Sequence, residues 1–206
     1  MTRLVLVRHG ESVWHAENRY AGVSDIGLTP LGLAQAGLLA GWAGDAGLSA
    51  IWTSTLSRAQ VTARASAERL GLEPRIDERL RELGFGHAEG LTRDEMGEQF
   101  PDALAAFHAD PVAGHLPGGE DPVKAAERFT GCLRDIAAEH EGGRVLVVAH
   151  TTAIRLALCA LIGVPLRDYR RVFPFLRNCA ITEVRLRDGQ AALLEYNTEL
   201  TGGTPS

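Results

Sequence analysis

The stretch that decides the fold is LVLVRHGES, residues 4–12, in which four aliphatic residues run directly into Arg8 and His9. A short run of this kind is typical of a buried strand, and the following Gly10 allows a ligand to approach the backbone closely. An arginine offers paired donors to phosphate oxygens, and a neutral imidazole can attack phosphorus. The end of this strand therefore indicates an anion site, with a surface turn held by a structural ion pair as the alternative.

Two further apolar runs, Ala50–Thr53 and Val145–Ala149, are also predicted to be strands, and they lead into Ser54 and His150. Helices are expected between and after the strands. Their expected ranges are 30–42 after the N-cap Thr29, 56–70, a helix opened by the Thr92-x-x-Glu95 capping box, 121–140, and 152–162. A hairpin or pair of edge strands is expected over 180–186 and 191–196, around Asp188-Gly189.

Strands that alternate with helices predict an α/β fold, a three-layer sandwich with a mainly parallel central sheet and helices on both faces. In such sheets ligands bind beyond the carboxyl ends of the strands. Arg8, His9, Arg58 and His150 all follow predicted strands. They are therefore expected on one rim, although His9 and His150 are far apart in the sequence.

The amino-acid composition limits the classes of protein to which the chain can belong and the partners that it can bind. The chain has 206 residues, 45% of them hydrophobic, and a net charge of −5, which is typical of one globular domain and of neither a nucleic-acid-binding nor a membrane-bound protein. The three cysteines are scattered, so we expect neither a disulfide framework nor a zinc site with thiolate ligands. Their small number and their spacing instead favour a cytoplasmic location. The histidines show no metal-binding spacing, so we expect no metal or other cofactor. A homodimer through an edge strand remains open.

Further motifs follow LVLVRHGES in order: Asn18-Arg19, Gly22, the pattern STLSRAQVTA at 54–63, RELGFGHAEGLT at 81–92, PGGE at 117–120 and VVAH at 147–150. Together they resemble the histidine phosphatase superfamily, also called the phosphoglycerate mutase-like family. The resemblance runs nearly the whole chain. It implies the phosphoglycerate mutase-like fold and one domain over residues 1–200, followed by a tail, 201–206, that we expect to be flexible.

The resemblance also implies roles for individual residues. His9 would be the nucleophile that becomes phosphorylated, Arg8, Arg58 and His150 would hold the phosphoryl group, and Glu82 would be the general acid and base. Glu89 is the rival acid, less favoured because the family's acid precedes a glycine-rich turn, here 84–86. The arginines should lower the pKa of His9, and burial should favour protonated Glu82.

Substrate contacts are implied for Ser12, His15, Ala21, Gly22 and Thr151. Three of these depart from the family pattern: Thr151 stands where glycine is usual, His15 where asparagine is common, and Ala21 where serine or threonine often lies. The core of the site is intact, so we expect activity with an altered substrate pose. An added backbone contact to phosphate is expected from the N–H of Thr151.

The resemblance favours the phosphatase branch, acting on small organic phosphate monoesters. Residues 97–120 contain no lysine or arginine, so few cations are expected to be available for the second phosphate that a mutase must bind. A cofactor-dependent phosphoglycerate mutase and a module that binds phosphorylated ligands without turnover remain alternatives. The apolar residues Leu104, Phe107, Leu116, Phe173 and Phe175 would form either a lid beside the pocket or part of the core.

Overall fold

The computed structural model describes residues 1–201, so all but the first residue of the predicted tail lies outside it. Within this range the sheet has the order β3-β2-β4-β1-β5-β6. Strands β1 to β4 run parallel where they pair, and β5 and β6 are antiparallel. The strands are β1 (Thr2–Arg8), β2 (Ala50–Thr53), β3 (Arg75–Ile76), β4 (Arg144–Ala149), β5 (Ile181–Arg187) and β6 (Gln190–Thr198).

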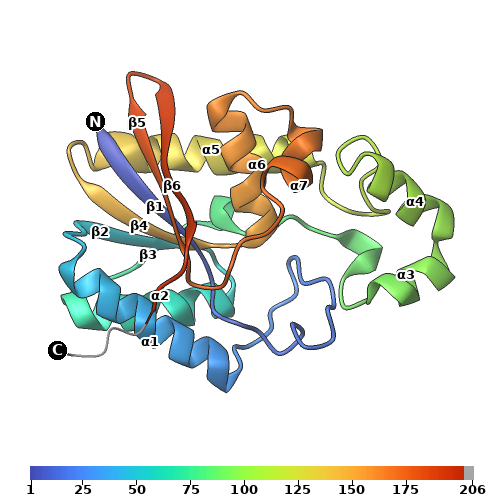
Figure 1. Cartoon of the computed structure of the whole chain (residues 1–206), viewed down its shortest axis with the longest axis horizontal. Helices are drawn as coiled ribbons and strands as arrows, with labels where there is room; N and C mark the ends of the chain where they lie inside the picture. The colour runs from blue at the N-terminus through green and yellow to red at the C-terminus, as the bar shows by residue number, and fades with distance from the viewer. Residues whose placement is uncertain (202–206) are drawn as a thin grey trace.

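Helices cover both faces of this sheet (Figure 1). One face carries α1 (Pro30–Asp45) and α2 (Ser57–Leu70), and the other carries α5 (Pro122–Glu139) and α6 (Thr151–Ile162). The shorter elements are η1 (Glu78–Leu80), η2 (Gly86–Ala88), α3 (Arg93–Gln99), α4 (Pro101–Ala109), η3 (Leu166–Asp168) and α7 (Tyr169–Val172). The predicted three-layer α/β sandwich is confirmed.

The alternation of side chains along β1 shows how the two cores form. Leu4 and Leu6 pack in the core beneath α5 and α6, whereas Val5 and Val7 pack in the core beneath α1 and α2. Because successive side chains of a strand point to opposite faces, a continuous apolar run is what a strand covered on both faces requires.

Local sequence signals set most element ends. Thr29 caps α1 by accepting the N–H of Gly32, and Thr92 and Glu95 form the predicted capping box of α3. The hairpin is confirmed, with Asp188 and Gly189 both at positive φ as a two-residue turn needs. Of the two hairpin strands, β6 lies at an edge of the sheet and β5 does not, because β5 pairs with β1. The short elements β3, α4 and α7 were not predicted from the sequence.

The carboxyl ends of β1, β2 and β4 meet at one side of the sheet, where the loop after β1 begins (Figure 1). Over residues 1–201 no helix combines the length and apolar character that crossing a membrane requires.

Candidate active site

His9 is held by its backbone directly after β1. Its N–H donates to the carbonyl of Ala149 (3.0 Å), and its carbonyl accepts from the side-chain amide of Asn178 (2.8 Å). The ring Nδ1 lies 2.6 Å from the carbonyl oxygen of Gly10, so Nδ1 carries the proton and donates it there. The other nitrogen, Nε2, accepts from Nε of Arg58 at 3.2 Å. This tautomer leaves a lone pair on Nε2, as a nucleophile needs.

Arg58 projects from the first turn of α2 and is fully buried. Its Nη1 donates to the carbonyl of Ser24 (2.7 Å), and its Nη2 donates to those of Gly22 (2.6 Å) and Ala21 (3.4 Å). Carbonyls satisfy its donors without cancelling its charge. Burial, together with the charges of Arg58 and then Arg8, holds the pKa of His9 well below its usual range, in the direction expected from the sequence.

His150 directly follows β4 and is the N-cap residue of α6. Its ring centroid lies 5.1 Å from that of His9. Its Nε2 is 2.7 Å from Oγ of Ser54, and that oxygen accepts the N–H of Leu56 and can therefore donate its own hydrogen to the ring. Burial and then Arg58 lower the pKa of His150, so the ring is neutral and Nδ1 carries its hydrogen. That Nδ1 is buried without a hydrogen-bond partner among residues 1–201.

Glu82 is buried at the N-terminus of α6 and is 2% exposed. Its Oε1 accepts the N–H groups of Leu83 and Ala153, both at 2.8 Å, and its Oε2 accepts that of Thr152 at 3.0 Å. Burial raises the pKa of this carboxyl, and the three N–H bonds oppose the rise without cancelling it. Burial thus favours the protonated form, as an acid requires.

Glu89, the alternative candidate for the general acid, instead binds the backbone of a loop. Its carboxylate accepts the N–H groups of Gly22, Val23, Ser24 and Phe85 and the hydroxyl of Ser24. These bonds fix the loop that Arg58 holds from the other side. Glu89 does not line the pocket beside His9.

Arg8 and His15 stand together at the rim. Nη1 of Arg8 donates to the carbonyl of Leu176 (2.8 Å), and Nη2 lies 3.4 Å from Nδ1 of His15. Nε of Arg8 is buried and has no partner within residues 1–201. Arg8 therefore retains hydrogen-bonding capacity toward the pocket.

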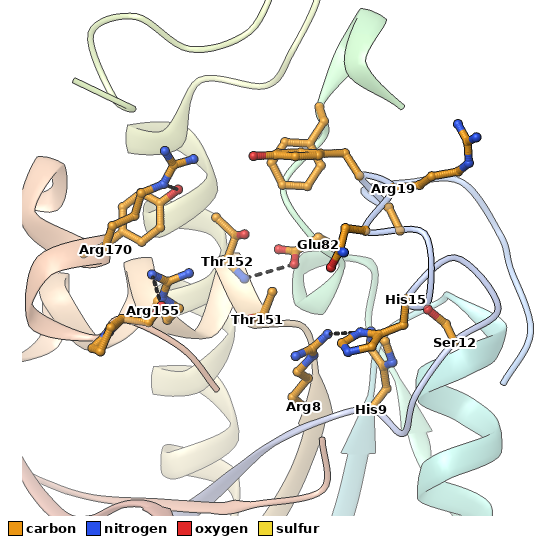
Figure 2. A pocket seen from close by; sticks show the side chains of 16 residues that line it. Arg8, His9, Ser12, His15, Arg19, Glu82, Thr151, Thr152, Arg155 and Arg170 are labelled. Atoms are coloured by element: carbon orange, nitrogen blue, oxygen red, sulfur yellow. Dashed lines mark hydrogen bonds between the residues drawn. The ribbon is translucent and has the colours of Figure 1, made fainter. Parts of the chain in front are cut away.

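A pocket of about 460 Å³ opens in front of His9 (Figure 2). Of the residues expected to act on or bind substrate, those that line it are Arg8, His9, Ser12, His15, Ala21, Glu82 and Thr151. Arg58 and His150 lie behind His9 and contact it rather than the pocket. Gly22 is buried as well, bonded to Glu89 and Arg58, so any effect it has on substrate is indirect.

The model of the histidine phosphatase superfamily (branch 1) matches residues 4–199. The chain belongs to this superfamily. The chain is 34% identical over 198 residues to phosphoserine phosphatase 1 of Hydrogenobacter thermophilus, covering 96% of this chain and 92% of that protein. It is also 34% identical over 207 residues to the protein named "Probable phosphoglycerate mutase GpmB" of an Enterobacter species, covering 98% and 93%.

Solved structures of histidine phosphatases share the fold. YhfR of Bacillus stearothermophilus superposes with a TM-score of 0.91 at 30% identity, covering 97% of this chain and 98% of that one. Mycobacterial glucosyl-3-phosphoglycerate phosphatase superposes with a TM-score of 0.88 at 30% identity, covering 96% and 99%. The relatives of this chain thus include proteins named as phosphatases and as probable mutases.

The cation content of the pocket is higher than the sequence suggested. Residues 97–120 contribute none, but Arg19, Arg155 and Arg170 join Arg8 in the lining. Arg19 belongs to a motif quoted above, and Arg155 follows the second histidine on α6, whereas no local pattern marked Arg170. The expectation that few cations surround the site was wrong, because it counted one segment and not the whole rim.

Of the two alternatives for the apolar residues, a lid or part of the core, the core is correct for four of the five. Leu104, Phe107, Leu116 and Phe173 are buried away from the pocket, and Phe175 is 51% exposed beside a neighbouring hollow. The aromatic side chains that line the pocket are instead Tyr20, Phe85 and Tyr169. Tyr20 and Phe85 meet edge to face, with ring centroids 5.0 Å apart.

Gly10 has a packing reason that the sequence did not reveal. A Cβ there would lie 2.4 Å from the carbonyl oxygen of Gly32 in the first turn of α1. The glycine therefore serves the close approach of helix to strand end, rather than the approach of a ligand. No group of three or more His, Cys, Asp or Glu side chains that could hold a metal ion occurs among residues 1–201.

Proposed function

We propose that this histidine phosphatase hydrolyses small organic phosphate monoesters through a phosphohistidine on His9. The observation that carries the proposal is the buried, neutral His9, whose Nε2 lone pair faces the Arg58 guanidinium and whose ring lies beside His150. Nε2 attacks phosphorus, the bond from phosphorus to the leaving oxygen breaks, and Glu82 gives its proton to that oxygen.

Water then completes the turnover. It attacks the phosphohistidine and gives a proton to Glu82, the phosphorus–nitrogen bond breaks, and His9 and inorganic phosphate are released. Oε2 of Glu82 accepts one N–H bond where Oε1 accepts two, which makes Oε2 the better site for the transferred proton. The partnerless Nε–H of Arg8 and the N–H of Thr151, two residues that line the pocket, are suited to donate to phosphoryl oxygens.

The charge of the site supports a phosphatase over a mutase. Four arginines in or directly behind the pocket, Arg8, Arg58, Arg155 and Arg170, form no ion pair with a carboxylate among residues 1–201. The bisphosphorylated intermediate of a mutase carries about four to five negative charges. Four positive charges at most equal the lower of these values, whereas they exceed the roughly two negative charges of one phosphate, so the site is better supplied with cations for one phosphate than for two.

The test is release of inorganic phosphate from p-nitrophenyl phosphate and a panel of alkyl phosphates. We expect His9→Ala to lose at least about 10³-fold in kcat and the exposed His115→Ala to match wild type. Rapid quenching with labelled substrate should trap an acid-labile, alkali-stable phosphoenzyme in wild type and none in His9→Ala. Full activity of His9→Ala would refute the proposal.

The relative named as a probable phosphoglycerate mutase keeps that activity as the second candidate. It predicts isomerisation of 3-phosphoglycerate, stimulated by bisphosphoglycerate and faster than phosphate release. Ligand binding with neither reaction would instead indicate a module without turnover.

A further inference from the structure

Arg170, in α7, presents an uncommitted guanidinium edge to the pocket. Its Nε donates to the hydroxyl of Tyr169 at 3.0 Å, and its guanidinium carbon lies 4.1 Å from the ring centroid of Phe107. The side chain of Arg170 makes no other hydrogen bond, and has no carboxylate within ion-pair distance, among residues 1–201. Stacking and the Nε bond fix the plane of the group and leave both Nη atoms as a fork, the arrangement that binds a carboxylate through two bonds.

Arg155 supports the same wall of the pocket. It is buried, its Nε donates to the carbonyl of Phe173 (2.5 Å), its Nη2 donates to that of Pro174 (3.2 Å), and its guanidinium carbon lies 4.7 Å from the ring of Tyr169. These carbonyls cancel no charge. Figure 2 shows Arg155 and Arg170 on one side of Thr151 and Thr152, with Arg8 and His9 on the other.

Arg19 provides the contrast within the same pocket. It is paired with Glu17 at 2.7 Å and Glu95 at 2.8 Å, so its charge is compensated. The uncompensated charge is therefore localised: it lies at the phosphate position and on the wall of Arg155 and Arg170.

Charge balance indicates what that wall accepts. With Glu82 protonated, as its role as the acid requires, Arg8, Arg58, Arg155 and Arg170 carry four positive charges. A phosphate dianion at His9 offsets about two of them and leaves about two. The remaining charge on the wall of Arg155 and Arg170 favours a further anionic group there, and the two Nη atoms of Arg170 match the two oxygens of a carboxylate.

Resting on the phosphatase function above, we propose that Arg170, backed by Arg155, binds a carboxylate on the leaving group. The preferred substrates are then phosphorylated hydroxy acids, with the phosphate at His9 and the carboxylate at the Arg170 fork. The competing explanation is mechanical, because stacking on Phe107 could serve only to tie α4 to α7.

The test compares matched substrates that differ only in the carboxylate: 3-phosphoglycerate against glycerol 1-phosphate, and 4-phosphoerythronate against erythritol 4-phosphate. We expect wild type to favour the acid of at least one pair in kcat/KM by about 10- to 100-fold, and Arg170→Gln to lose most of that preference. The control is Arg171→Gln, at an adjacent exposed arginine that pairs with Asp168, and it should keep the wild-type preference.

Two outcomes would overturn the carboxylate site. One is a wild-type enzyme that treats acid and alcohol alike in both pairs. The other is an Arg170→Gln variant that slows acid and alcohol equally, as a purely mechanical role through Phe107 predicts.

Calorimetry on His9→Ala separates this inference from the proposed reaction. Tighter binding of 3-phosphoglycerate than of glycerol 1-phosphate, lost on adding Arg170→Gln, supports the carboxylate site even if no phosphate is released from any ester. Equal binding of the two probes overturns it even if hydrolysis proceeds.

Discussion

Replacing Glu82 with glutamine tests the acid most directly, because the change keeps the size of the side chain and removes its transferable proton. General acids contribute about 10²- to 10⁴-fold to rate, or about 3 to 5 kcal/mol. We expect losses of that size with alkyl phosphates, whose leaving oxygen needs a proton, and a much smaller loss with p-nitrophenyl phosphate, whose leaving group departs as an anion. Glu78→Gln, at an exposed position of η1, is the matched control.

The same substitution has a cost in stability that follows from the hydrogen bonds. The glutamine oxygen can still accept from Leu83 and Ala153, but its NH₂ group then faces the N–H of Thr152. A buried unpaired donor costs about 1 to 3 kcal/mol, which lowers Tm by about 2 to 12 °C in a chain of this size.

The stability that Glu82 contributes should decrease as the pH rises. Burial raises the pKa of folded Glu82, so the stability held by its protonated form is present below the ordinary pKa of glutamate and is lost as pH rises through the folded pKa. The Tm gap between wild type and Glu82→Gln should therefore narrow with rising pH.

The activity assay is the ratio of kcat/KM for an alkyl phosphate to that for p-nitrophenyl phosphate, followed from pH 4 to 9 so that ionisation of the substrate phosphate largely cancels. In wild type the ratio should fall as Glu82 deprotonates, and in Glu82→Gln it should be low and flat. A wild-type ratio that does not change with pH, or a variant that hydrolyses alkyl phosphates normally, would show that Glu82 is not the acid.

Two further substitutions test the framework of the site. Arg58→Lys keeps the charge but cannot reach three carbonyls and His9 together, so kcat should fall about 10²- to 10³-fold, while Arg64→Lys on the exposed face of the same helix should not change it. Gly10→Ala should lower the free energy of unfolding by about 1 to 3 kcal/mol in denaturant melts, because its Cβ meets the carbonyl of Gly32, whereas Gly37→Ala in α1 has open space and should not destabilise. If Arg64→Lys lowered kcat as much as Arg58→Lys, the contacts of Arg58 would not be the cause. If Gly37→Ala destabilised the protein as much as Gly10→Ala, the close approach to Gly32 would not be the cause.

Much of the fold follows from local patterns in the sequence. Buried strands produce continuous apolar runs, and Thr29, Thr92 and Asp121 mark helix starts through side-chain caps. The elements that escaped prediction, β3, α4 and α7, are too short to show a period, and they depend on tertiary contacts. The meeting of His9 and His150 follows from the pairing of β1 with β4, a property of topology that no local spacing encodes.

The rim of the pocket was harder to predict for a different reason. Arg170 lies on a four-residue helix and is distinguished from Arg171 only by what it contacts: Arg171 pairs with Asp168, whereas Arg170 stacks on Phe107. Two neighbouring arginines look alike in sequence. Packing alone decides which of them faces the pocket.

The loop of residues 21–24 explains why two charged side chains, the buried Arg58 and the half-buried Glu89, both contribute to the environment of His9. Arg58 donates to the carbonyls of this loop, and Glu89 accepts its N–H groups. Each ion is satisfied by backbone dipoles rather than by the other, so Arg58 keeps its full charge next to His9 while its orientation is fixed. A direct ion pair would have held the arginine equally well, but it would have cancelled the field that keeps His9 neutral and that can stabilise a transferring phosphoryl group.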